Sequence, residues 1–263
     1  MKKILQVLNG IALISTVFIN YLSNTGALNN TTIGEVSKDL NNLFTPASYA
    51  FAIWGLIYLM LFGFIFYQGR SLFVNVRNDD FITKIGGWFI ISCVANSAWV
   101  FCWIYGYTGI SCLFIFLLLF SLLKIIYNNN MELFHAPISV ILFLWWPFVF
   151  YAGWVTVASI ANVAAYLTKV GWNGFGLSDV AWTVIMMIIA SILNLIVIWK
   201  RNMREFALVG VWALVAIGIA NKNIENLVAY TAFVAAAILF INLSIHGYQN
   251  RKTNPFLRLN QKK

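Results

Sequence analysis

The chain contains about eight apolar stretches, each close to 20 residues long, with short polar linkers between them. A helix rises about 1.5 Å per residue, so roughly 20 apolar residues cross the hydrocarbon core of a bilayer. Hydrophobic residues make up 61% of the 263 residues, and a soluble domain could not hide that much apolar surface from water. Backbone groups in lipid must be satisfied internally, and these stretches lack the alternation of barrel strands. The sequence therefore predicts an all-α, polytopic membrane protein with about eight transmembrane helices, near residues 4–22, 47–67, 86–106, 109–127, 139–167, 179–199, 205–221 and 227–247.

The basic residues predict how these spans are oriented. With the N-terminus inside, only Lys38, Lys169 and Lys222 of the 17 Lys and Arg residues fall in outside segments. Positively charged loops face the cytoplasm, so we expect a plasma-membrane protein with both termini cytoplasmic. The net charge of +9 then comes from inside loops and a basic tail, which indicates contact with anionic lipid and no nucleic-acid partner. One alternative is that the first span is a cleaved signal peptide, which would leave seven spans.

The chain has no recognisable catalytic or metal-binding pattern. No Asp or Glu lies in the middle of a predicted span, and His135 and His246 are far apart in sequence. Cys93, Cys102 and Cys112 form no CxxC pair, which favours a packing role. We expect no enzymatic activity, no metal and no cofactor. Proton-coupled transport is also disfavoured, because pumps generally need buried ionisable relays.

Three predicted spans carry stripes in which aromatic side chains share one helix face with an amide or a small residue. Such stripes fit two interpretations. Asn and small residues commonly hold helices together in lipid, while aromatic walls with a few polar groups are typical of a pocket for a flat apolar ligand. The candidate ligand-binding residues are Pro46, Phe51, Trp54 and Tyr58, then Asn96, Trp99 and Trp103, and then Tyr151, Trp154, Ala158 and Asn162.

These stripes resemble the TspO/MBR family, the tryptophan-rich sensory proteins related to the mitochondrial translocator protein. The family has five helices, and its motifs occur in the first five spans in the same order. Pro46, Phe51 and Trp54-Gly-Leu-Ile-Tyr58 look like the second helix, and Asn96-Ser-Ala-Trp99 is similar to the third. Trp154, Ala158 and Asn162 match the Trp-x-x-x-Ala-x-x-x-Asn pattern of the fifth.

The resemblance implies a division of the chain and a function. Residues 1–167 would form a TspO-like five-helix bundle, 168–250 a three-helix extension without a counterpart in that family, and 251–263 a cytoplasmic tail. Family members bind tetrapyrroles such as protoporphyrin, and some bind sterols, under a loop that follows the first helix. The implied function is membrane ligand binding or sensing, with residues 23–45 as the lid and a porphyrin or sterol-like molecule as the partner. A homodimer stays an open alternative.

Two other functions remain open. One is a transporter of a small solute or lipid, with Asn96, Asn162, Asn194 and Asn242 along its path. The other is enzymatic degradation of a bound porphyrin. Small residues between 179 and 247 let helices approach closely, so we expect this segment to act as scaffold and to contribute nothing to the ligand site.

Overall fold

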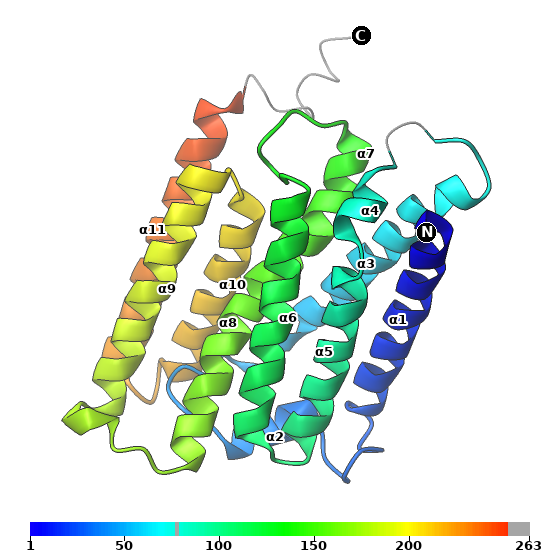
Figure 1. The fold of residues 1–263 in the computed structure, drawn as a ribbon. Helices are drawn as coiled ribbons and strands as arrows, with labels where there is room; N and C mark the ends of the chain where they lie inside the picture. The colour runs from blue at the N-terminus through cyan, green and yellow to red at the C-terminus, as the bar shows by residue number, and fades with distance from the viewer. Residues whose placement is uncertain (77–78, 252–263) are drawn as a thin grey trace.

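A computed structural model of the protein describes residues 1–76 and 79–251, and every regular element in these two ranges is helical. The helices pack as an upright bundle (Figure 1). In chain order they are α1 (Lys2–Leu22), α2 (Ile33–Asp39), η1 (Ser48–Ala52), α3 (Ile53–Gly69), η2 (Arg70–Leu72), α4 (Phe81–Ile85), α5 (Trp88–Ile104), α6 (Thr108–Asn128), α7 (Ile138–Val140), η3 (Ile141–Trp145), α8 (Trp146–Lys169), η4 (Gly174–Gly176), α9 (Asp179–Arg201), α10 (Arg204–Asn221) and α11 (Asn226–Gln249).

The long helices correspond to the eight predicted spans. Within the described residues, seven helical stretches are long and apolar enough to cross a membrane. Two of them join several elements, Ser48–Leu72 and Ile138–Lys169, and α5 adds an eighth apolar helix of 17 residues. The predicted all-α membrane fold is therefore confirmed.

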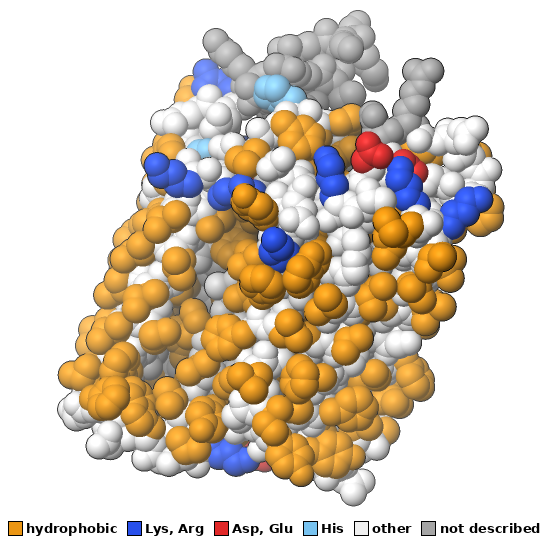
Figure 2. Space-filling view, in the orientation of Figure 1, with side chains coloured by type: hydrophobic (Ala, Val, Ile, Leu, Met, Phe, Trp, Pro, Cys, Tyr) orange, Lys and Arg blue, Asp and Glu red, His pale blue; other side chains and the backbone are white. Residues whose placement is uncertain are grey.

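The distribution of apolar and polar side chains between the surface and the interior is the reverse of that in a soluble protein. Large apolar side chains such as Leu59, Phe66 and Leu113 are at least 70% exposed in the middle of long helices. Amide side chains such as Asn9 and Asn96 are instead fully buried. Figure 2 shows the apolar side chains covering the flank of the molecule, with Lys and Arg gathered mainly near one end. Such a flank suits hydrocarbon, and the charged end suits the lipid headgroups.

The start of α1 and the end of α11 lie at that basic end of the bundle (Figure 1). We call it the terminal end, and the end that carries α2 the opposite end. The predicted cytoplasmic tail, residues 251–263, lies outside the described residues apart from Arg251.

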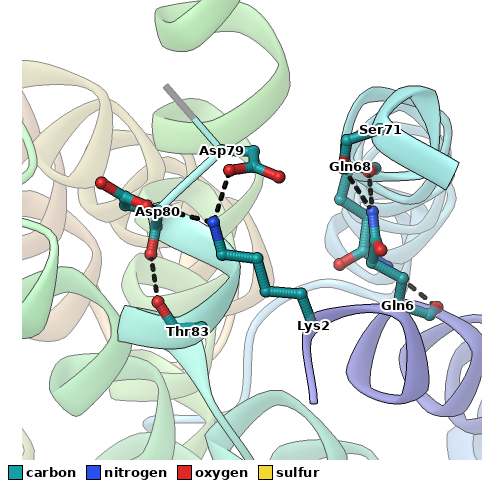
Figure 3. A network of polar contacts seen from close by, with 7 residues as sticks. All are labelled: Lys2, Gln6, Gln68, Ser71, Asp79, Asp80 and Thr83. Atoms are coloured by element: carbon teal, nitrogen blue, oxygen red, sulfur yellow. Dashed lines mark hydrogen bonds and ion pairs between the residues drawn. The ribbon is translucent and has the colours of Figure 1, made fainter. Parts of the chain in front are cut away.

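Polar contacts fasten α1 to its neighbours at the terminal end (Figure 3). The Asn9 amide donates to Gln68 Oε1 at 3.0 Å, and the Gln68 amide donates to the Gln6 carbonyl at 3.2 Å. Lys2 forms ion pairs with Asp79 at 2.6 Å and Asp80 at 3.1 Å. The hydrogen bond from Lys2 also lowers the pKa of Asp79 below its ordinary value. Apolar residues cover the outer face of α1, so these polar groups position it on the bundle.

α10 joins the three C-terminal helices to the rest of the bundle. It packs against α8 on one side and against α9 and α11 on the other. A Cβ at Gly153 of α8 would lie 3.0 Å from the Phe206 carbonyl oxygen and 3.1 Å from the Val209 Cβ of α10. On the other side, the Gly218 Cα faces the ring of Phe233, which would clash with a Cβ at 2.7 Å. The expected close packing through small residues is present, while the predicted division at residue 168 stays a prediction.

We predict that Gly153→Leu destabilises the protein by about 1–3 kcal/mol, the usual cost of overpacking a tight contact. Gly55→Leu is the matched control, because Gly55 also lies inside a helix but a Cβ there would have no neighbouring atom within 4 Å. Thermal unfolding in detergent should show a lower midpoint for Gly153→Leu only. Equal midpoints for the two variants would contradict the close α8–α10 contact.

Candidate ligand-binding site

The segment between α1 and η1 crosses the opposite end of the bundle and is fastened in its middle and near its C-terminal end. Its only helix, α2, begins with a capping box in which the Thr32 hydroxyl accepts from the Glu35 amide at 3.2 Å. Trp103 of α5 donates to the Ile33 carbonyl at 3.3 Å. Asn221 of α10 donates to the Leu43 carbonyl at 2.9 Å. The expected lid is therefore an ordered cover, held by α5 on one side and by α10 on the other.

Beneath this cover lies a small cavity of about 50 Å³ with aromatic walls. Most of the candidate residues meet there, although they come from three different spans. Those that line the cavity are Pro46, Phe51, Trp54, Trp99, Trp103, Trp154, Ala158 and Asn162. The three stripes thus face a common point inside the bundle, and none of them faces lipid.

The other three candidates, Tyr58, Asn96 and Tyr151, lie behind the cavity wall. Trp54 stacks on Tyr58 with ring centroids 5.6 Å apart and meets Tyr151 edge-on at 5.7 Å. The Asn96 amide donates to the Tyr151 hydroxyl at 3.0 Å. These residues support Trp54 and do not line the cavity.

The aromatic rings of the wall hold one another in place. Trp154 meets Phe51 edge-on at 6.0 Å and Trp54 at 6.3 Å. Trp99 stacks on Trp103 at 5.9 Å. Aromatic pairs of this kind contribute about 0.5–1.5 kcal/mol each beyond the area that they bury. These contacts therefore favour one arrangement of the walls.

Asn162 orients one of these walls. Its Oδ1 accepts a hydrogen bond from Trp99 Nε1 at 2.7 Å, and its Nδ2 lies 2.9 Å from the Ser111 hydroxyl and 3.0 Å from Cys112 Sγ. The amide has little hydrogen-bonding capacity left for a ligand. Asn162 therefore fixes the Trp99 ring, which is the role that helix packing predicts for a buried Asn.

Asn96 is held in a similar way by a residue that the sequence motifs did not reveal. Asn20 of α1 donates to Asn96 Oδ1 at 2.7 Å and also to the Thr16 carbonyl at 2.9 Å. Thr16 and Asn20 are one turn apart on α1 and both are buried. That polar i, i+4 pair inside an apolar span is the signal in the sequence that could have identified them.

Trp154 differs from these paired groups. Its side chain is only 2% exposed and lines the aromatic cavity, yet its indole N–H has no hydrogen-bond partner in the structure. A buried donor without a partner costs about 1–3 kcal/mol. A ligand with an acceptor atom at this point would recover that free energy.

A larger cavity of about 720 Å³ adjoins the aromatic one, and the two share the wall residues Ser37, Thr45, Pro46 and Phe51. It lies between the cover, the C-terminal half of α8 and the helices α9 and α10. Its volume is in the range of about 300–1,000 Å³ that is usual for ligand pockets. Thr183, Met186 and Asn221 are among the wall residues that the C-terminal helices supply. The segment 179–247 thus packs as expected, but it also walls a ligand-sized cavity, which differs from the expectation that it acts as scaffold alone.

Two of the amides considered for a transport path lie elsewhere. Asn194 donates to the Ala190 carbonyl of its own helix at 2.8 Å, and its side chain packs against Gly210. Asn242 is half-buried on α11 and accepts from Trp199 at 3.3 Å. Neither lines the aromatic cavity or the larger cavity beside it. The four amides therefore do not surround a common path in this structure.

The fold and this site define a polytopic helical membrane protein with two adjoining cavities at the end opposite its termini, one aromatic and one ligand-sized, which we together call the aromatic recess. In agreement with this, the model of a protein family described as "TSPO-like protein" matches residues 6–245. The chain belongs to this family. The match extends through α9 and α10 and most of α11. No curated protein and no solved structure matches the chain significantly.

We predict that Asn162→Leu destabilises the ligand-free protein by about 1–3 kcal/mol, because Trp99 and Ser111 lose a buried partner. Asn242→Leu removes an amide that is only half-buried and should have a smaller effect. Unfolding in mixed micelles would measure both variants. If Asn162→Leu were as stable as the unmodified chain, the amide would not be holding the wall.

Proposed function

We propose that the protein is a membrane ligand-binding or sensory protein for a flat, largely apolar ligand, and that a tetrapyrrole such as a porphyrin is the best candidate. The observation that carries this proposal is the meeting of Trp54, Trp99 and Trp154 beneath the cover, next to a cavity of about 720 Å³. Aromatic walls with few polar groups suit a large π-system.

The volumes suggest where such a ligand would lie. The aromatic cavity of about 50 Å³ is far too small for a tetrapyrrole, while the adjoining cavity is large enough. We therefore place the macrocycle mainly in the larger cavity, with one edge against Phe51 and Pro46, which belong to both. A movement of the cover would let that edge reach the unpaired N–H of Trp154.

The polar groups of the larger cavity support a ligand with acidic substituents at its rim. Lys38 lies on the exposed side of the cover, and Asn41 and Asn42 follow it along the same wall. An exposed lysine can meet a carboxylate without leaving water, at a modest gain of about 0–1 kcal/mol. We expect these contacts to set the orientation of the ligand and the aromatic walls to supply most of the affinity.

We further propose that the protein lies in the plasma membrane with both termini cytoplasmic, so that the recess opens to the outside. The asymmetric distribution of Lys and Arg supports this orientation.

We predict that Trp154→Ala weakens porphyrin binding by about 1–3 kcal/mol, the scale of a lost aromatic contact and its buried area. That loss corresponds to roughly a 5- to 150-fold higher Kd. Protoporphyrin titration of the purified protein, followed by quenching of Trp fluorescence, would measure it. Trp154→Phe would separate the ring from the N–H, because Phe keeps an aromatic wall and lacks the donor.

Trp199→Ala is the control for that titration, since Trp199 is 44% exposed near the C-terminal end of α9. It should remove a fluorophore without changing the Kd. The same Kd for Trp154→Ala and the unmodified chain would remove Trp154 from the site.

We predict that a single cysteine at Lys38 reacts with a membrane-impermeant maleimide added to intact cells, while one at Arg70 reacts only after permeabilisation. Lys38 lies at the opposite end of the bundle and Arg70 at the terminal end. The native cysteines at 93, 102 and 112 would first be replaced by Ala. The reverse labelling pattern would overturn the proposed orientation.

A further inference from the structure

A second large cavity, of about 860 Å³, lies at the terminal end of the bundle. Four parts of the chain meet around it: the loop between α6 and α7, the short π-helix η3, the start of α10 and the end of α11. Asn202 fastens two of these parts together, because its amide donates to the Glu132 carbonyl at 3.1 Å and its Oδ1 lies 3.2 Å from His246 Nε2. The cavity is thus bounded by ordered structure and is separate from the aromatic recess.

Buried polar atoms without a hydrogen-bond partner are concentrated around this cavity. Trp145 and His246 are 2% and 4% exposed, and Trp145 Nε1 and His246 Nδ1 have no partner. The same holds for the wall atoms Glu132 Oε1, Arg204 Nε and Glu205 Oε2, although the Glu205 carboxyl group also interacts with the Trp146 side chain. Buried polar atoms are normally paired, so a group of unpaired ones on a single cavity indicates a missing partner.

The charges on the wall indicate what that partner carries. Among the described residues, neither Glu132 nor Glu205 forms an ion pair within 4.0 Å. When both are ionised, two carboxylates and the Arg204 guanidinium leave one negative charge in the cavity. A ligand with a single positive charge would balance it and would make charge-assisted hydrogen bonds to the unpaired carboxylate oxygens.

The apolar walls indicate the size and shape of the ligand. Phe134 and Trp145 meet edge-on with centroids 5.0 Å apart on the wall of the cavity. Aromatic faces attract cations and also pack against apolar groups. A volume of about 860 Å³ is far larger than a metal ion needs. In addition, no group of three or more His, Cys, Asp and Glu residues suited to a metal occurs in the described chain.

We propose that this cavity binds an organic cation, a primary ammonium group on an aromatic or apolar body, with Glu132 and Glu205 as the acceptors of the ammonium. Phe134 and Trp145 pack against the body of the ligand. Arg204 limits the cavity to one positive charge. The proposal does not depend on the function proposed for the aromatic recess, because no residue lines both sites.

The site also predicts a pH dependence. Burial and the neighbouring charge of Glu205 raise the pKa of Glu132 to about 8, with Arg204 opposing the shift. The other titratable groups on the cavity wall are His135 and His246. Below that pKa Glu132 carries a proton that the ammonium must displace, while an alkyl ammonium stays charged up to a pH of about 10. Affinity should therefore increase as the pH rises from about 6.5 to 9.

Calorimetric titration of the full-length protein in detergent micelles would test the proposal, with 2-phenylethylammonium as the probe and the neutral 2-phenylethanol as its matched analogue. We expect the ammonium to bind at least tenfold more tightly at pH 8.5. Glu132→Gln and Glu205→Gln should each raise its Kd at least tenfold, the scale of one charge-assisted hydrogen bond, with little effect on 2-phenylethanol. Asp39→Asn, an exposed acid at the opposite end, should leave both values unchanged.

Three results would overturn the proposal: no heat of binding with the ammonium, equal affinity for the two probes, or unchanged affinity in both Gln variants. Glu132 lies in a loop, so Glu132→Gln keeps the test decisive even if Glu205→Gln fails to fold. Porphyrin titration of the same Glu132→Gln protein should give an unaltered Kd. Because Glu132 lines only the cavity at the terminal end, an unaltered porphyrin Kd would show that the two sites are tested independently.

Discussion

Hydrocarbon offers no hydrogen bonds, so each polar side chain inside this bundle must find its partner within the protein. Asn96 binds Asn20 and Tyr151, and Asn162 binds Trp99 and Ser111. These contacts decide how α1, α5, α6 and α8 face one another. The aromatic cavity exists because the helices that carry its rings are held in these orientations.

This constraint separates two roles that the sequence motifs combine. The amides of the stripes make their hydrogen bonds to neighbouring helices and have little capacity left for a ligand, so they position the walls. The rings of Trp54, Trp99 and Trp154 face the cavity and remain available to a ligand. Packing and binding are therefore not competing interpretations of the stripes, because the packing contacts are what hold the binding surface in shape. Trp154 is the exception on the wall, since its N–H has no partner.

The length of the apolar stretches was sufficient to predict the spans, and helical periodicity was sufficient to place the residues of each stripe on one face. Residues four apart on one helix share a face, so Trp154, Ala158 and Asn162 had to point in one direction. The larger cavity could not be predicted in this way. Thr183 and Asn221 belong to separate helices with no stripe of their own, and they meet the cover only through the packing of α10 on α8. The cavity at the terminal end is similar, because Glu132 and Glu205 are brought together from a loop and a distant helix.

The recess beneath the cover is proposed to receive a flat apolar ligand. An experimentally determined structure of the protein in lipid nanodiscs with saturating protoporphyrin would test this most directly. We expect density for the macrocycle between the cover and the helices α8, α9 and α10, in contact with Phe51 and Pro46. Density only on the lipid-facing flank, or only in the cavity at the terminal end, would contradict the proposal.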